Sequence, residues 1–396
     1  MKILIVTTRI PFPLKDGGAI QGYTNTMGYV QQQHQVTMFA LATPKHGINP
    51  AELPTEFTQN IALHTTAVNT NVRLLPAFFN LFTKKSYNIT RFFSPEANAK
   101  LQKLLQTQTF DIIHLESPYI ADYLPTIQKH SHAKIILRAH NVEHIIWKRM
   151  SEKASNLALK WYFKLCAKRL YIYEKNLLNQ VDAVVAITPN DQKMFVEIGC
   201  KKPIFVSSGG ANIGSPPNFL LPQNHAICFI ASLDWLPNIE GLNWFLEQVL
   251  PKIIEKNPNA VVNIAGRNMP QKIAQQASKN IKIWGEIDHA QTYMQQNGVL
   301  IVPLLSGSGM RIKLVEAMAL GKAIVSTSVG AEGVCGTHLE HYYIADTPQT
   351  FADACLKLLQ NPEICTDLGK NAYFLAKTHY DNQKINAELC QFYATL

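Results

Sequence analysis

The segment Val302–Val334 carries the residue types best suited to hold a phosphorylated ligand. It opens with a glycine- and serine-rich loop that runs directly into a predicted helix, and glycines let a backbone approach a ligand closely. The free N–H groups and the positive dipole end of a helix start attract anions such as a diphosphate. The candidate ligand-binding residues here are Gly307, Ser308, Gly309, Met310, Arg311, Lys313 and Glu316.

Three charged side chains of this segment suit different parts of one ligand. Arg311 and Lys313 are cations in the first turn of the predicted helix, where they oppose the helix dipole. Their position is explained if an anion lies between them, so we treat both as candidate catalytic residues that neutralise a diphosphate. The Glu316 carboxylate can accept two hydrogen bonds from a vicinal diol such as ribose. The competing interpretation is an exposed, charged helix with Glu316 in a salt bridge.

Two further candidates follow predicted strands in the first half of the chain. His140 directly follows the apolar run Lys134–Ala139, and a neutral imidazole can donate to or accept from a sugar hydroxyl. Glu116 follows the run Phe110–Leu115 and is a candidate for orienting an acceptor. The competing interpretations are a histidine satisfied within the core and a carboxylate on a surface loop.

Asn141 and a short glycine loop complete the candidate set. Asn141 is a candidate acceptor contact, although the sequence also suggests that it caps the helix starting near Val142. Gly17 and Gly18 lie between the first predicted strand and the next helix, where their backbone can approach a donor. This loop lacks the G-x-G-x-x-G pattern of dinucleotide-binding proteins, and an ordinary strand-to-helix turn explains it equally well.

Short apolar runs alternate with helical stretches along the whole chain, which predicts parallel sheets wrapped by helices. One set of runs lies before a break rich in Gly, Pro and Asn at 207–217, and a second set follows it. The predicted fold class is therefore α/β, with two Rossmann-like lobes and a ligand cleft between them at the carboxyl ends of the strands. The expected domains are 1–208 for the acceptor, 209–376 for the donor, and a C-terminal helical segment, 377–396, that packs back on the first domain.

The run Glu316-Ala317-Met318-Ala319-Leu320-Gly321 resembles the donor-binding signature of family 4 glycosyltransferases, which have the two-lobed GT-B architecture. The resemblance implies that Glu316 holds the donor ribose, that His140 reaches the donor sugar, and that transfer retains the anomeric configuration. The first glutamate of the family's E-x7-E pattern falls at Ser308, so this half of the motif is missing. The loop 231–238 also lacks the cations that such enzymes place there, and we hypothesise that Arg311 and Lys313 replace them.

The net charge of +9 is concentrated in the first half of the chain. Residues 1–215 hold 24 basic and 13 acidic residues, a balance of +11, whereas the remainder has 13 basic and 15 acidic residues, a balance of −2. Two basic segments with interleaved aromatic residues, 73–103 and 147–175, suit peripheral contact with an anionic membrane or a lipid-linked acceptor. The competing interpretation is core aromatics with solvated lysines, and no nucleic-acid-binding module is recognisable.

The remaining sequence signals favour a cytoplasmic enzyme without a cofactor. The seven cysteines show no C-x-x-C spacing, and no apolar run is long enough for a signal peptide or a membrane span. Neither a P-loop nor a metal-ligand spacing is present, so we expect no metal ion and a nucleotide sugar as substrate.

The predicted function is a glycosyltransferase that moves a sugar from a nucleotide-diphosphate donor to a glycan or lipid-linked acceptor in cell-surface polysaccharide biosynthesis. A nucleotide-sugar epimerase of the same fold and a non-catalytic nucleotide-sugar-binding protein remain the alternatives.

Overall fold

The chain forms two compact units in the computed structural model. The first unit comprises Met1–Ser208 together with Asn386–Leu396, and the second comprises Gly209–Ile385. The predicted C-terminal segment 377–396 is therefore divided, because only its last eleven residues, 386–396, belong to the first unit. The structure describes residues 1–14, 17–44, 52–72, 75, 79–80, 82–83, 85–219, 226–307 and 309–396.

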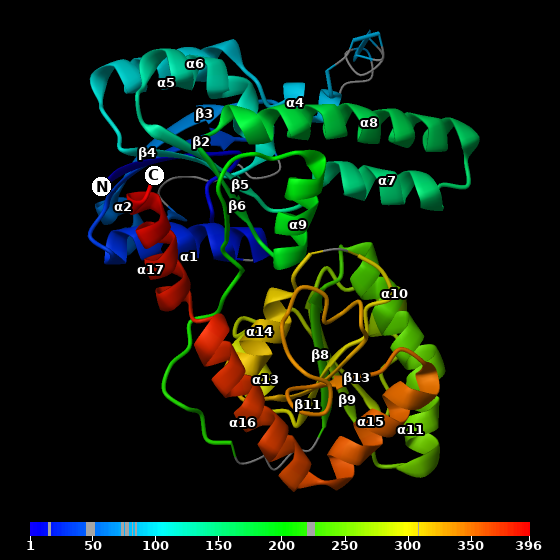
Figure 1. Cartoon of the computed structure of the whole chain (residues 1–396). Helices are drawn as coiled ribbons and strands as arrows, with labels where there is room; N and C mark the ends of the chain where they lie inside the picture. Colours follow the sequence, from blue (N-terminus) through cyan, green and yellow to red (C-terminus); the bar gives the residue numbers. More distant parts are fainter. Residues whose placement is uncertain are drawn as a thin grey trace. The chain divides into compact units, whose positions relative to one another are not determined.

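A sheet of parallel strands forms the centre of the first unit, in the order β3-β2-β1-β4-β5-β6-β7 (Figure 1). The sequence predicts every strand of this sheet except β3, an edge strand whose alternating exposed residues give only a weak apolar signal. The strands are β1 (Lys2–Thr7), β2 (Gln35–Ala42), β3 (Ile61–Ala67), β4 (Ile112–Leu115), β5 (Lys134–Ala139), β6 (Ala183–Ala186) and β7 (Ile204–Val206).

Helices cover both faces of this sheet. Buried residues of α5, α6, α8 and α9 form one core with the strands, and those of α1, α2 and α17 form a second core on the other face. The helices are α1 (Gly17–Gln31), α2 (Thr55–Asn60), α4 (Tyr87–Thr90), α5 (Pro95–Thr107), η2 (Pro118–Tyr123), α6 (Leu124–His130), α7 (Glu143–Lys153), α8 (Leu157–Gln180), α9 (Pro189–Ile198) and α17 (Asn382–Ala394).

Helical periodicity in the sequence predicts one long helical segment over 142–180, whereas the structure has two helices there, α7 and α8. The chain leaves helical geometry at Ala154, and the side chain of Asn156 then caps α8 by accepting from the backbone N–H groups of Ala158 and Leu159 at 2.9 and 3.1 Å. Such a cap satisfies N–H groups that have no partner within the helix. The two helices pack against each other as a long hairpin (Figure 1).

The second unit repeats the same design around a parallel sheet in the order β10-β9-β8-β11-β12-β13. Its strands are β8 (Ile227–Ser232), β9 (Val262–Arg267), β10 (Ile281–Gly285), β11 (Val299–Val302), β12 (Ala323–Ser326) and β13 (Tyr343–Ile344). Its helices are α10 (Leu236–Trp244), η3 (Phe245–Val249), α11 (Leu250–Lys256), α12 (Gln271–Ala274), α13 (Ala290–Gln295), α14 (Ile312–Ala319), α15 (Pro348–Gln360) and α16 (Pro362–His379).

The core of the second unit again lies on both faces of its sheet. One cluster joins the strands to α10, α11 and α15, and the other joins them to α13, α14 and α16. Two parallel sheets flanked by helices confirm the predicted α/β fold class with two Rossmann-like units. In each unit, the segments that follow the carboxyl ends of the strands are where a ligand site is expected.

Candidate functional site

The glycine-rich loop of the second unit lies between the carboxyl end of β11 and the start of α14. Gly307 and Gly309 have φ angles of 119° and 86°, which side chains other than glycine rarely adopt. A Cβ atom on Gly307 would lie 2.7 Å from the Arg311 Nη2 atom and 3.0 Å from the Trp235 ring. The loop therefore needs glycine at this position for its backbone angle and for its close packing. Ser308, which stands where the family has its first glutamate, lies outside the described residues.

Arg311 is the N-cap residue of α14, one position before the helix rather than inside its first turn. Its guanidinium carbon lies 5.0 Å from the centroid of the Trp235 ring, a distance typical of a cation–π contact. Burial lowers the pKa of Arg311, and Glu332 partly offsets this effect. The stacking fixes a half-buried cation at the helix start, and the neighbouring Met310 is also half-buried there.

Lys313 and Glu316 lie on the first turns of α14 and interact electrostatically. The Lys313 Nζ atom donates to the carbonyl oxygen of Ile230, near the carboxyl end of the neighbouring strand β8. Burial lowers the pKa of Lys313 to about 8, opposed by Glu316 and reinforced by Arg311. Burial likewise raises the pKa of Glu316, opposed by Lys313. The ion pairs found among the described residues do not include Glu316, so the salt-bridged alternative is not what the structure shows.

Arg267 is a cation at the same edge that the sequence reasoning missed. It ends β9, its Nε atom donates to the Ser232 Oγ atom at 3.1 Å, and its Nη2 atom lies 4.0 Å from the Asp234 Oδ2 atom. Ser232 is the last residue of β8, and Asp234 lies in the loop 231–238, whose sequence contains no Lys or Arg. The available signal in the sequence was a cation just after the apolar run 260–265. Because β8 and β9 pair in register, this cation lies beside the end of β8.

In the first unit, Glu116 and His140 lie together after the neighbouring strands β4 and β5. The Glu116 carboxylate contacts the Nε2 atom of His114 at 2.9 Å, the Nε2 atom of His140 at 3.2 Å and the Nε atom of Arg138 at 3.7 Å. Burial alone would raise the pKa of Glu116, but His114, His140 and Arg138 together hold it well below its usual value. Glu116 is thus a largely buried carboxylate surrounded by two histidines and an arginine, not the surface carboxylate of the competing interpretation.

His140 is the member of this cluster that can reach a ligand. Its side chain is 33% exposed, whereas those of His114 and Arg138 are fully buried. The His140 Nε2 atom also lies 3.0 Å from the main-chain oxygen of Glu116, so both of its neighbours there are acceptors. A proton on Nε2 satisfies both, and in the neutral ring the Nδ1 atom is then the acceptor.

The cluster extends into the core through groups far apart in the sequence. The Nδ1 atom of His114 lies 2.8 Å from the Tyr393 hydroxyl on α17 and 3.1 Å from the Tyr29 hydroxyl on α1. Arg138 donates to the main-chain oxygen of Ser207 at 3.3 Å, and to Asn25 at 2.9 Å when the amide oxygen of Asn25 faces it. These contacts link His114 and Arg138, the neighbours of Glu116, to α1, α17 and the segment after β7.

The suggestion that Asn141 caps α7 is wrong. The N-cap residue is Val142, and the buried carboxylate of Glu174 from α8 accepts from the backbone N–H groups of Glu143 and His144 at 2.8 and 3.0 Å. A side chain distant in sequence therefore does what a local cap usually does. Asn141 itself is half-buried beside His140 and remains a candidate acceptor contact.

Glu143 is a second titratable group that the sequence reasoning did not select. Burial, with the nearby Glu174, raises its pKa to about 7, although the hydrogen bond from the Tyr119 hydroxyl, at 2.6 Å, and the neighbouring His140 oppose the rise. Gly17 and Gly18 are exposed at the start of α1, which follows β1, while Asp16 lies outside the described residues.

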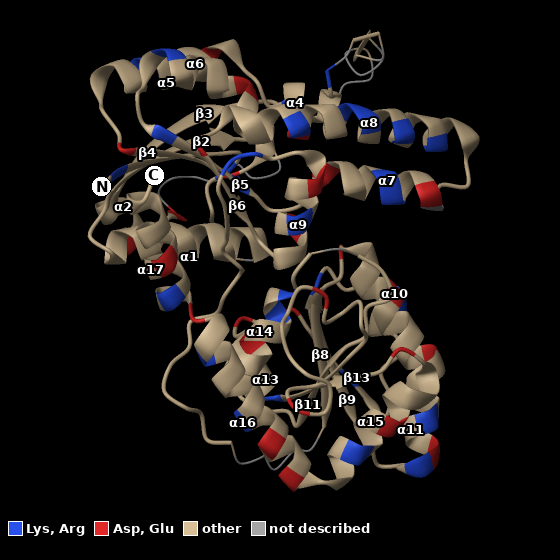
Figure 2. Ribbon diagram, viewed as in Figure 1, with Lys and Arg blue, Asp and Glu red and all other residues tan. Residues whose placement is uncertain are grey.

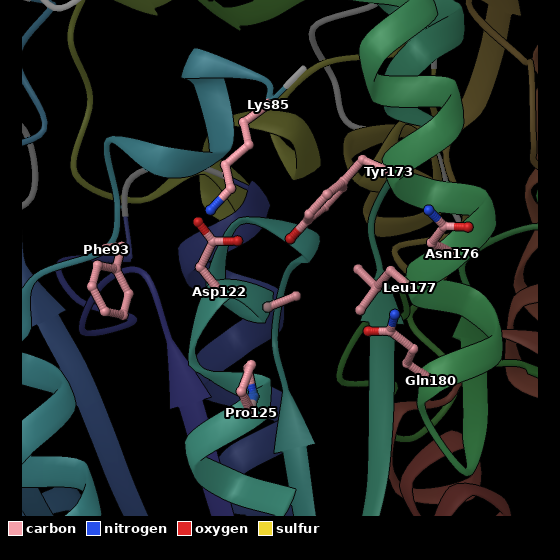
Figure 3. A pocket seen from close by; sticks show the side chains of 9 residues that line it. Lys85, Phe93, Asp122, Pro125, Tyr173, Asn176, Leu177 and Gln180 are labelled. Carbon is pink, nitrogen blue, oxygen red and sulfur yellow. The ribbon is translucent and has the colours of Figure 1, made fainter. Parts of the chain in front are cut away.

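A pocket of about 360 Å³ on the first unit does not contain the predicted site. Figure 3 shows the Lys85 amino group and the Asp122 carboxylate facing each other among the side chains that line it. Burial raises the pKa of Asp122, and Lys85 opposes this shift. The lining residues are Lys85, Phe93, Ala121, Asp122, Pro125, Tyr173, Asn176, Leu177 and Gln180, and none of the predicted site residues is among them.

Within the described part of the chain, there is no cluster of three or more His, Cys, Asp or Glu side chains arranged to hold a metal ion. Of the helices that the structure describes, none combines the length and apolar character that crossing a bilayer requires.

Two Rossmann-like units, one of them with a glycine loop, cations and a carboxylate at a helix start, are features that many nucleotide-binding enzymes share. The sequence pattern of "Glycosyltransferase Family 4" matches residues 17–214, and that of "Glycosyl transferases group 1" matches residues 224–361. The chain belongs to the family 4 glycosyltransferases, and it is a glycosyltransferase.

Similar proteins cover most of the chain. An uncharacterised 44.6 kDa protein from the cps region of Klebsiella pneumoniae is 23% identical, with 97% of each chain covered. The phosphatidyl-myo-inositol mannosyltransferase of Mycobacterium tuberculosis H37Rv is also 23% identical, with 77% of this chain and 79% of that chain covered.

Two solved structures share the fold. The sucrose-phosphate synthase of Thermosynechococcus elongatus has a TM-score of 0.72 at 14% identity, covering 100% of this chain and 99% of its own. Anabaena HepE, in complex with UDP, has a TM-score of 0.70 at 14% identity, covering 100% of both chains. At 14% identity, these structures show only that the fold is shared.

Proposed function

We propose that this glycosyltransferase takes its sugar from a nucleoside-diphosphate donor held by the second unit. The observation that carries the proposal is the grouping of Arg311, Lys313 and Glu316 around the start of α14, at the carboxyl edge of the sheet. The cations and the loop N–H groups bind the diphosphate, and Glu316 accepts from the ribose hydroxyls. Arg267 lies at the same edge and adds positive charge.

The main catalytic task is to stabilise the diphosphate as it leaves. The bond between the anomeric carbon and the diphosphate oxygen breaks, the acceptor oxygen bonds to that carbon, and the acceptor proton passes to the departing phosphate. Arg311 and Lys313 then act most strongly on the transition state, where the negative charge develops. Protein groups alone provide this stabilisation, so the proposed reaction needs neither a metal ion nor a cofactor.

In the first unit, His140 contacts the donor sugar, and Glu116 keeps the imidazole in one orientation. Because the His140 Nε2 atom faces two oxygens of Glu116, its Nδ1 atom is the group that meets a sugar hydroxyl. Gly17, Gly18 and Asn141 complete the proposed contacts to donor and acceptor. We further propose that the configuration at the anomeric carbon is retained.

The proposed acceptor is a glycan or a lipid-linked sugar in the synthesis of a cell-surface polysaccharide, made on the cytoplasmic side of the membrane. Support comes from the cps-region relative of Klebsiella pneumoniae and from the phosphatidyl-myo-inositol mannosyltransferase, whose name includes a lipid. A reduced, cytoplasmic location fits the seven free cysteines.

The test begins with nucleoside diphosphates, starting with UDP because Anabaena HepE is known in complex with it. A nucleotide that binds the folded protein raises its melting temperature, and its sugar derivatives are then assayed with and without lipid-linked and glycan acceptors. We expect donor consumption that depends on acceptor and falls sharply in Glu316→Ala. Epimerisation of a free nucleotide sugar would instead identify an epimerase, and binding without turnover under any acceptor would indicate a non-catalytic protein.

A further inference from the structure

The hairpin of α7 and α8 presents a long outer surface on which several large side chains are exposed among the described residues of the first unit. Its inner side is packed: Trp147 meets Phe163 with ring centroids 5.7 Å apart, and the His144 Nδ1 atom lies 2.7 Å from the Glu174 carboxylate. The buried residues of α8 are Cys166, Leu170, Glu174, Leu177 and Leu178. The opposite side of α8 is therefore the side left to solvent.

That exposed side is both apolar and basic. Leu157 is 81% exposed, Trp161 is 61% exposed and Ile172 is 50% exposed, which is unusual for side chains of this size. The exposed residues recur every three or four positions, so they share one face of the helix. We call this the basic–aromatic face of α8, and it consists of Leu157, Lys160, Trp161, Lys164, Lys168, Tyr171, Ile172 and Lys175.

The charge on this face is of one sign. The single acidic residue of α8 is Glu174, and it is buried against α7. Over residues 143–180, eight basic residues against three acidic ones leave a balance of +5. Figure 2 shows blue positions repeated along α8.

We propose that the basic–aromatic face of α8 docks on an anionic phospholipid surface. Tryptophan and tyrosine favour the boundary between headgroups and acyl chains, where Leu157, Trp161 and Ile172 lose contact with water. The lysines at 160, 164, 168 and 175 then meet the headgroup phosphates. A nucleic acid would match the charge but not the aliphatic side chains, so lipid is the better partner.

The inference adds a partner to the proposed function and does not depend on it, because docking needs neither donor nor acceptor. The docking face lies in 147–175, one of the two basic segments of the sequence. The other segment, 73–103, lies partly outside the described residues, so its surface does not enter the inference.

The test is co-sedimentation of the full chain with two kinds of vesicle, one of phosphatidylcholine and one that also contains phosphatidylglycerol. We expect binding to the anionic vesicles that weakens as salt rises above about 0.1 M. The double variant Lys164→Glu/Lys168→Glu should bind at least about tenfold more weakly, because each basic residue near the surface contributes severalfold. Trp161→Ser should weaken binding at every salt concentration, since it removes apolar insertion.

The matched control is Lys129→Glu/Lys201→Glu, two exposed lysines of the same unit outside the hairpin, which should bind vesicles like wild type. Melting temperature and nucleotide binding, measured on every variant, separate this inference from the proposed function. Equal binding to both kinds of vesicle, no binding to either, or full binding by the charge-reversed variant would overturn it. Competition by single-stranded or duplex nucleic acid in place of lipid would do so as well.

Discussion

Replacing Lys313 with methionine separates the stability of the second unit from its binding of a donor. Burial shifts the pKa of Lys313 from 10.5 to about 8, which corresponds to a cost of at most about 3 kcal/mol in the folded protein. Because the folded-state pKa is lowered, this cost is fully present below about pH 8 and disappears as pH rises towards the unfolded value. Replacing Lys313 removes this cost, but it also leaves the Ile230 carbonyl without its donor, which costs about 1–3 kcal/mol.

Lys313→Met should therefore leave the free energy of unfolding unchanged or raise it by up to about 2 kcal/mol. A charge-assisted hydrogen bond to the diphosphate is worth about 1.5–3 kcal/mol, so the dissociation constant of the nucleoside diphosphate should rise by about 10- to 100-fold. Denaturant unfolding measures the first quantity, and titration calorimetry measures the second.

The pH dependence gives an independent check. In the wild type, the dissociation constant of the nucleoside diphosphate should rise as pH passes about 8. Above this pH the free enzyme loses the Lys313 proton, whereas the bound diphosphate keeps Lys313 protonated in the complex. This rise should be absent from Lys313→Met between about pH 7 and about pH 10.

Lys322→Met is the matched control for both measurements. Lys322 is buried in the same unit, its Nζ atom donates to the main-chain oxygen of Asn297, and burial lowers its pKa. It precedes β12 and so lies at the amino edge of the sheet, away from the glycine loop. Its replacement should leave nucleotide affinity unchanged. The reasoning is refuted if Lys313→Met binds as tightly as wild type, keeps the wild-type pH dependence, or weakens binding no more than Lys322→Met.

Three further predictions concern other members of the candidate site. Glu316→Ala should weaken nucleotide binding by about 10- to 100-fold in calorimetry, with a smaller loss for a 2′-deoxyribose nucleotide, and equal losses for both sugars would contradict a ribose contact. Glu116→Gln should lower the free energy of unfolding by about 3–5 kcal/mol, because Arg138 stays buried without its counter-charge. Because the pKa of Glu116 is depressed in the folded protein, this carboxylate stabilises the wild type above the ordinary pKa range of a carboxyl group, and that stabilisation is lost as pH falls below this range. An acid-denaturation curve that is the same in the variant and the wild type would count against the cluster. Gly307→Ala should weaken nucleotide binding severalfold through strain of about 1–3 kcal/mol at φ 119°, and wild-type affinity in this variant would show that the loop conformation is unimportant.

The sequence by itself determined the layers of the fold and the grouping of the candidate donor-binding residues. Buried apolar runs separated by helices specify parallel strands, because only a sheet covered on both faces buries every residue of a strand. The glycine loop, the cations and Glu316 are close in sequence, so their proximity follows from a single turn and helix. The same local signals missed β3, whose edge position removes one buried face.

Only the tertiary structure decided the surroundings of Glu116 and the true cap of α7. Glu116 meets His140 because β4 and β5 pair in register, and His114 meets Tyr393 although 279 residues separate them. Glu174 caps α7 in place of Asn141 because α8 folds back along it. Periodicity specifies which face of an element is buried, whereas strand order and chain reversal decide which side chains meet there, and these depend on contacts that no local pattern encodes.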